Sequence, residues 1–250
     1  MDNKIDFMGL HYDNVDLDEA VAKMEQYIQE GTPHIVCSTA AELVVRAQTN
    51  QLLKDTYDKA DLLTLDSKVN QWSAALLGYK AKSPVGTAKL ILHFLEKTKH
   101  KNYKYFILGA KQEVLEQAVK NMAQQYPNIK IVGSHHGYFK EQDEERIFEQ
   151  IRQAKPDVLM AAMTSPLKER ILMQNHSKIG VPVAIGVGGG VDIIAGFVTL
   201  APVWISDLGL EWLYRLIQEP KRFWPRYRET YPTYIKMVMK KCVEQRITHK

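Results

Sequence analysis

The residues best suited to chemistry in this sequence of 250 residues include a glycine-rich segment at 186–190. The apolar run 182–185 precedes it, and a helix is predicted to begin near Val191 with Asp192 in its first turn. Glycines let backbone N–H groups approach a ligand, and a helix N-terminus favours an anion, so the segment is suited to bind a phosphate. Val191 stands where a dinucleotide-binding GxGxxG motif requires its third glycine. A tight structural turn is the alternative, and the pattern alone leaves both interpretations open.

Asp66 is the second candidate, because it directly follows the apolar run 62–65. At the edge of a ligand site, a carboxylate can act as a general base that removes a proton from an attacking hydroxyl. A carboxylate at this position can equally cap the helix that follows, and the sequence does not decide between the two roles. The chain contains no GxSxG, P-loop or HExxH motif, so it gives no support to a covalent hydrolase, an NTPase or a zincin.

No pattern in the sequence indicates a metal site. Residues 16–18 form a DxD triplet, but they stand where a helix is predicted to begin, and acidic residues are favoured at helix starts. His135 and His136 are adjacent without a cluster of further ligands, and Cys37 and Cys242 form no CxxC pair. We therefore expect neither a metal ion nor a cofactor.

Apolar runs that alternate with helical periods provide the framework for these residues. Strands are predicted at 6–10, 34–37, 62–65, 103–108, 129–132, 157–162, 182–185 and 202–205. Such alternation predicts an α/β fold of Rossmann-like type, with a mostly parallel sheet covered by helices on both faces. Ligands of these sheets bind beyond the carboxyl ends of the strands. The residues expected at that rim are Ser38, Asp66, Gly109, Tyr138, Ser165 and Gly188.

The charge of the chain is concentrated near its end. Residues 208–250 carry ten lysines and arginines against four acidic residues, while the formal net charge of the whole chain is only +4. Aromatic residues interleave with these basic residues at helical spacing from Phe223 to Tyr234. This pattern suits an anionic membrane surface or single-stranded nucleic acid, and a helix packed on the body with a solvated basic face is the simpler alternative. We therefore divide the chain into an α/β body, 1–207, and a helical basic appendage, 208–250.

The composition limits the class of protein. With 45% apolar and 25% charged residues, the chain is typical of a globular protein with a substantial core. No run approaches the roughly 20 apolar residues of a membrane-spanning helix. Residues 1–16 lack the pattern of a signal peptide, so we expect a cytoplasmic protein.

Several motifs coincide with those of one known family. They are Tyr126-Pro127, Ile131-Val132-Gly133, Gly137-Tyr138-Phe139, Gly186-Val187-Gly188-Gly189 with Asp192 and Gly196, Ala201-Pro202, and Gly209–Leu216 with Glu219-Pro220 and Arg222. On these motifs the chain resembles the WecG/TagA/CpsF glycosyltransferases from about residue 5 to residue 241. The resemblance implies metal-independent, inverting transfer of N-acetylmannosamine, or a related hexose or uronic sugar, from a UDP-sugar. The implied acceptor is N-acetylglucosamine on a polyprenyl diphosphate, in the synthesis of bacterial surface polysaccharide or teichoic acid.

The resemblance also assigns roles to individual residues. Asp66 corresponds to the catalytic base, and Arg215 and Arg222 correspond to arginines that reach the leaving diphosphate. Without a metal, such fixed cations must stabilise the charge that develops there. The expected substrate-binding residues are Ser38, Thr39, Gly109, Tyr138, Lys168, Gly188, Gly189 and Asp192.

The location and partners of the protein follow from the same resemblance. The expected partners are a UDP-sugar, a polyprenyl-diphosphate-linked sugar and an anionic membrane surface that the appendage contacts. This places the protein in the cytoplasm, peripherally associated with the inner face of the cell membrane. We expect no nucleic-acid partner, and the sequence leaves a homo-oligomer open.

Several polar positions depart from the family pattern. The changed positions, each followed by the usual family residue, are Ala40 (Asn), Ser67 (Gly), Ser83 (Arg), Ala88 (Asp), Lys168 (Gln), Leu200 (Arg) and Pro225 (a tail Arg). One hypothesis is an active glycosyltransferase with altered donor or acceptor choice, in which Lys168 supplies a cation or pairs with an acidic sugar. The alternative is a non-catalytic nucleotide- or lipid-binding relative that acts as a partner of other glycosyltransferases. The retained Asp66 and tail arginines favour the first hypothesis.

Overall fold

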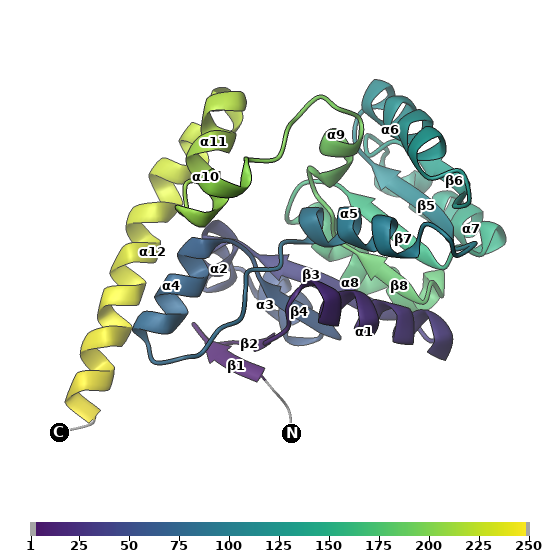
Figure 1. The fold of residues 1–250 in the computed structure, drawn as a ribbon. Helices are drawn as coiled ribbons and strands as arrows, with labels where there is room; N and C mark the ends of the chain where they lie inside the picture. The colour runs from purple at the N-terminus through teal and green to yellow at the C-terminus, as the bar shows by residue number, and fades with distance from the viewer. Residues whose placement is uncertain (1–3, 249–250) are drawn as a thin grey trace.

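A six-stranded parallel sheet forms the centre of the computed structural model, which describes residues 4–248 (Figure 1). The order across the sheet is β4 (Leu62–Leu65), β3 (His34–Thr39), β8 (Val183–Ile185), β7 (Val158–Ala162), β5 (Lys104–Gly109) and β6 (Lys130–His135). All neighbouring pairs are parallel. The predicted α/β fold is therefore confirmed.

Helices cover both faces of this sheet, as predicted. One face is packed by α1 (Leu17–Glu30), α5 (Thr87–Thr98), α6 (Gln112–Gln125) and α9 (Gly190–Ile194). The other is packed by α2 (Ala41–Ala47), α3 (Gln51–Asp58), α4 (Lys68–Leu76), α7 (Glu144–Ala154), which η1 (Glu141–Asp143) precedes, and α8 (Leu167–Ile179). Successive residues of β7 enter opposite clusters: Val158 and Met160 face one, and Leu159 and Ala161 face the other. This alternation buries the sheet on both sides, because side chains of a strand point alternately to its two faces.

The N-terminal segment forms a hairpin instead of the single predicted strand 6–10. β1 (Lys4–Phe7) and β2 (Leu10–Asp13) pair antiparallel, and Met8 and Gly9 both have positive φ in the turn between them. Positive φ at both central residues is the geometry of a tight type I′ turn, which Gly9 adopts without strain. The triplet at residues 16–18 begins α1: the Asp16 side chain accepts from the Glu19 N–H at 2.9 Å in a capping box.

The predicted strand at 202–205 is wrong, because this segment is the short helix α10 (Val203–Asp207) with Pro202 as its N-cap. A short apolar run does not distinguish a strand from a helix, and proline is tolerated where a helix begins. Helices α11 (Glu211–Gln218) and α12 (Pro220–Thr248) follow, as predicted for the appendage.

Helix α12 runs along α2 and passes α4 at the side of the body (Figure 1). Tyr234 and Val238 of α12 belong to the apolar cluster on that face of the sheet. The buried Tyr234 hydroxyl donates to Asn70 Oδ1 at 2.6 Å, and Asn70 Nδ2 donates to the Thr39 carbonyl at 2.7 Å. The appendage thus shares a core with the body, while the division at residue 208 stays a prediction. None of the described helices has an apolar stretch long enough to cross a membrane.

Candidate active site

A cavity of about 210 Å³ lies beyond the carboxyl ends of β3, β4, β7 and β8, and residues of α11 and α12 line its other side. Parallel strands all end at one rim, so residues far apart in the sequence meet there. Of the strand-end residues expected at the rim, the cavity brings together Ser38, Asp66, Ser165 and Gly188. It also brings in side chains of the appendage, which belongs to a different part of the chain.

Most of the predicted site residues line this cavity. They are Ser38, Asp66, Lys168, Gly188, Gly189, Arg215 and Arg222. Among the positions that depart from the family pattern, Ala40, Ser67 and Ala88 also line it, whereas Ser83, Leu200 and Pro225 do not. The changed residues therefore include several that face the same space as Asp66.

Thr39 and Gly109 lie outside the cavity lining and have structural surroundings. The Thr39 side chain is fully buried, and its hydroxyl lies 2.6 Å from that of Tyr12. Gly109 has φ +133°, and a Cβ there would lie 2.4 Å from the Ala162 carbonyl carbon. Only glycine allows β5 and β7 to approach so closely at this point. Their predicted roles in substrate binding stay predictions.

Tyr138 and Asp192 also lie outside the cavity lining. The Tyr138 side chain is 71% exposed in the segment that follows β6. Asp192 is in the first turn of α9, and its Oδ2 would lie 3.6 Å from a Cβ on Gly189, which does line the cavity. Burial raises the pKa of Asp192, and the positive charge of Arg222 opposes that effect. Asp192 is thus next to the cavity, on the side of the glycine turn.

Asp66 is a half-buried carboxylate that lines the cavity, and its pKa is raised. Burial raises its pKa to about 6, and the negative charge of Glu211 adds to the increase, while Lys89 and Arg215 oppose it. Gly86 packs so tightly against the carboxylate that a Cβ there would lie 2.4 Å from Oδ1. Such a group can be ionised at neutral pH and still accept a proton, which are the properties of a general base.

Ser67, the residue after Asp66, has an unusual backbone conformation. It is the N-cap of α4 with φ +76° and ψ 149°, and its side chain does not cap the helix. This region of backbone conformation is almost restricted to glycine, which is the family residue here. Ser67 therefore adopts a strained backbone conformation that glycine would adopt without strain. The Ser67 N–H is directed at the Asp66 carboxylate and lowers its pKa.

Arginines of the appendage line the cavity beside the glycine turn. Arg215 Nη1 would lie 3.5 Å from a Cβ on Gly189. Arg222 lies over the Phe223 ring at 5.4 Å and pairs with Glu219 of its own chain segment at 2.9 Å. With backbone N–H groups of the glycine turn close by, these cations suit the charge of a diphosphate.

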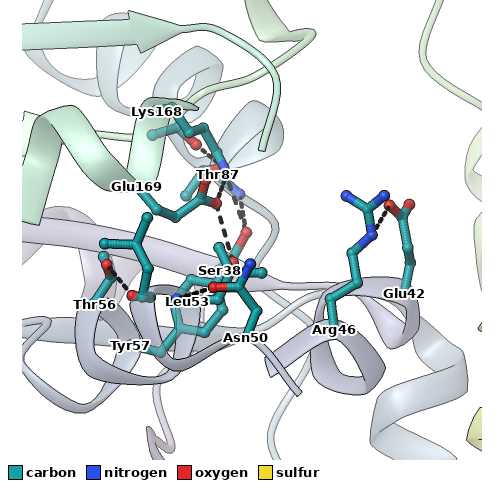
Figure 2. A network of polar contacts seen from close by, with 12 residues as sticks. Ser38, Glu42, Arg46, Asn50, Leu53, Thr56, Tyr57, Thr87, Lys168 and Glu169 are labelled. Carbon is teal, nitrogen blue, oxygen red and sulfur yellow. Dashed lines mark hydrogen bonds and ion pairs between the residues drawn. The ribbon is translucent and has the colours of Figure 1, made fainter. Parts of the chain in front are cut away.

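Lys168 lines the cavity but is already paired. Its ammonium contacts Glu169, whose carboxylate is fully buried and also accepts the Tyr57 hydroxyl at 3.0 Å (Figure 2). The pair contributes no net charge to the cavity wall. The sequence analysis considered Lys168 as a free cation. In the structure Glu169 neutralises the charge of Lys168.

Thr87, which the sequence analysis did not identify, fixes the Ser38 side of the cavity. The Thr87 N–H donates to Ser38 Oγ at 3.0 Å, and its hydroxyl donates to the Gly186 carbonyl at 2.8 Å (Figure 2). These bonds join the ends of β3 and β8 to the start of α5. The sequence feature that could have identified Thr87 is its position directly after Gly86, where a helix begins.

The appendage supplies further lining residues that sequence reasoning missed. They are Glu211, Trp212, Phe223, Arg226, Tyr227 and Tyr231. Arg226 pairs with Glu42 of α2 at 3.2 Å, which ties α12 to the body at the cavity. The aromatic spacing was visible in the sequence, but the direction in which the rings face was not.

Comparison with known proteins identifies the family of the chain. The sequence model of the glycosyl transferase WecG/TagA/CpsF family matches residues 5–248. The chain belongs to this family of glycosyltransferases. A relative from Bacillus subtilis (strain 168) is 29% identical over 93% of this chain and 90% of its own length. A relative from Staphylococcus aureus (strain MW2) is 29% identical over 88% of this chain and 86% of its own. Both are named N-acetylglucosaminyldiphosphoundecaprenol N-acetyl-beta-D-mannosaminyltransferase.

Proposed function

We propose that the protein transfers a sugar from a UDP-sugar to an N-acetylglucosamine-type sugar on a polyprenyl diphosphate, with inversion. The donor sugar is N-acetylmannosamine or a related hexose or uronic sugar. The names of the two relatives support this choice of acceptor and donor. The product belongs to bacterial cell-surface polysaccharide or teichoic acid synthesis.

The observation that carries the proposal is that Asp66, Arg215 and Arg222 line one cavity. An acceptor hydroxyl attacks the anomeric carbon of the donor, so that a new C–O bond forms while the bond to UDP breaks. Asp66 takes the hydroxyl proton, and the pair of electrons leaves with the UDP diphosphate. Arg215 and Arg222 stabilise the charge on that leaving group, and direct displacement inverts the anomeric centre.

The proposal includes no metal ion, because the arginines and the glycine turn supply the positive potential that the diphosphate requires. In residues 4–248, no group of three or more His, Cys, Asp and Glu side chains is arranged to hold a metal. We place the donor diphosphate at Gly188 and Gly189, with the nucleoside extending toward Asp192 and Tyr138 outside the cavity.

We also propose that the appendage holds the protein peripherally at the inner face of the cell membrane. Ile235, Met239 and Val243 are exposed apolar residues one helical turn apart on α12, and Lys236 and Lys240 lie between them. Apolar side chains flanked by lysines suit an anionic lipid surface, where a lipid-linked acceptor is found.

The test is a screen of UDP-sugars with a soluble lipid-diphosphate-linked N-acetylglucosamine analogue, in which UDP release is measured. Asp66→Asn is the matched variant, because it keeps the size of the side chain but cannot accept the proton. We expect release with one donor, reduced by at least about 100-fold in Asp66→Asn. Lys168→Gln, assayed with the same panel, tests whether Lys168 influences donor choice.

Silence across the whole panel, with UDP still bound, would contradict the transfer reaction. It would favour the non-catalytic alternative, in which the chain binds a nucleotide or lipid as a partner of other glycosyltransferases. Equal rates of UDP release for the parent protein and Asp66→Asn would contradict only the role of Asp66, not the transfer reaction.

A further inference from the structure

One wall of the cavity is aromatic. Trp212 of α11 and Tyr227 and Tyr231 of α12 all line it. The ring centroids of Trp212 and Tyr231 lie 5.4 Å apart, those of Tyr227 and Tyr231 4.8 Å, and those of Trp212 and Tyr227 6.1 Å. Phe223 packs against Tyr227, with ring centroids 5.3 Å apart. Mutual contact restricts the rings, so this wall is ordered before any ligand arrives.

The aromatic wall and Asp66 line the same cavity. Burial is the main cause that raises the pKa of Tyr227 and of Tyr231, and the negative charge of Asp66 adds to both increases. Both phenols therefore keep their protons at neutral pH and can donate a hydrogen bond. Within the part of the chain that the structure describes, neither hydroxyl has a hydrogen-bond partner, and neither is enclosed away from solvent.

The size of the cavity suits one sugar. Its volume of about 210 Å³ is below the roughly 300–1,000 Å³ of pockets that enclose drug-sized ligands. The glycine turn, with Arg215 beside Gly189, is the side assigned to the diphosphate. The aromatic wall, with Asp66 beside it, is left for the sugar that is attacking.

We propose that Trp212, Tyr227 and Tyr231 form the subsite for the acceptor sugar, a single pyranose ring. The C–H bonds on the apolar face of a pyranose carry partial positive charge, which the negative face of an aromatic ring attracts. The two phenol hydroxyls donate to sugar hydroxyls, and the attacking hydroxyl is held within reach of Asp66. This subsite rests on the proposed transfer reaction, since it names the place of its acceptor.

Binding measurements test the subsite without turnover. The probes are N-acetylglucosamine linked to decyl diphosphate and decyl diphosphate without the sugar, titrated calorimetrically into the full chain. The variants are Trp212→Leu and the double variant Tyr227→Phe/Tyr231→Phe, which keeps the rings and removes only the hydroxyls. Tyr214→Phe is the matched control, because its hydroxyl contacts Thr199 outside the cavity at 3.0 Å.

We expect the parent protein to bind the sugar-bearing probe more tightly than the sugar-free probe. Both variants should weaken the sugar-bearing probe about tenfold and change the sugar-free probe less than twofold, while the control changes neither. Equal binding of both probes to the parent protein, or an equal loss for both probes in the variants, would overturn the subsite. A protein that distinguishes the probes but releases no UDP would keep the subsite and overturn the transfer reaction.

Discussion

Gly86→Ala is expected to lower the activity of the protein only because the substitution displaces Asp66. Gly86 has φ −79° and ψ 141°, a conformation that alanine adopts readily, so the backbone is not strained by the substitution. The added Cβ would lie 2.4 Å from Asp66 Oδ1, 2.7 Å from Cγ and 2.9 Å from Oδ2. Separations below 3.0 Å essentially never occur for a real Cβ, so the carboxylate must move. Normal contact distances of ~3.5 Å require a shift of about 1 Å.

A displacement of this size is large for the general base that we propose Asp66 to be. Misplacement by about 1 Å costs about 100-fold in rate when the group must face a reacting atom. We therefore expect kcat for UDP release to fall about 100-fold. The KM for the donor should stay nearly unchanged, because the donor diphosphate is assigned to Gly188, Gly189 and the arginines. The measurement is steady-state UDP release, with donor binding followed by calorimetry.

The same substitution should also reduce stability through one identified contact. Overpacking of this kind costs about 1–3 kcal/mol of the free energy of unfolding. In an Asp66→Ala background the carboxylate is gone, so Gly86→Ala should be nearly neutral, and a double-mutant cycle measures the difference. A Gly86→Ala protein with kcat within about threefold of the parent and unchanged stability would refute the packing of Asp66 against Gly86.

Three further predictions follow from the site and the appendage. Activity requires ionised Asp66, whose pKa is about 6, so the rate should fall below about pH 6. Glu211→Gln removes a negative charge that raises the pKa of Asp66, so the acid limb of the pH–rate profile should move to lower pH. Ser67→Gly should raise the free energy of unfolding by about 1 kcal/mol in chemical denaturation, because glycine adopts φ +76° without strain. Replacing the exposed Ile235 and Met239 by serine should reduce sedimentation with anionic liposomes while the melting temperature stays within a few degrees.

Each of these has a result that would contradict it. Glu113→Gln on α6, outside the cavity lining, is the control for the pH profile, and an identical shift there would remove the assigned cause. A less stable Ser67→Gly protein would show that the serine side chain makes a compensating contact. Unchanged sedimentation of the double serine variant would direct membrane binding elsewhere, with Lys54→Ser on α3 as the control.

Much of the fold could be predicted because its signals are local. Apolar runs such as 158–163 are short and bounded by polar residues, and a period of 3.6 marks α1 and α6. Residues 202–205 were misassigned because four apolar residues carry no period, and the helix α5, which begins with Thr87, was not identified. Asp66 and the glycine turn were found because both directly follow a strand.

The site was less predictable where it depends on long-range contacts. Lys168 was expected as a free cation, and its pairing with the buried Glu169 and Tyr57 became visible only in three dimensions. Tyr227 was noted as part of an aromatic and basic pattern typical of a membrane surface. In the structure its ring lines the cavity instead, while Ile235 and Met239 face outward.

The sequence by itself determined the framework of this protein: the alternation of strands and helices, the placement of Asp66 and the glycine turn at strand ends, and the helical, basic appendage. Local hydrophobic periodicity and backbone requirements encode these features, and both are properties of neighbouring residues. The tertiary structure alone decided that α12 packs against α2 and α11, so that Trp212, Arg226 and Tyr231 line the same cavity as Asp66. It also decided the pKa of Asp66, because burial and the charges of residues distant in sequence act only once the chain has folded around the carboxylate.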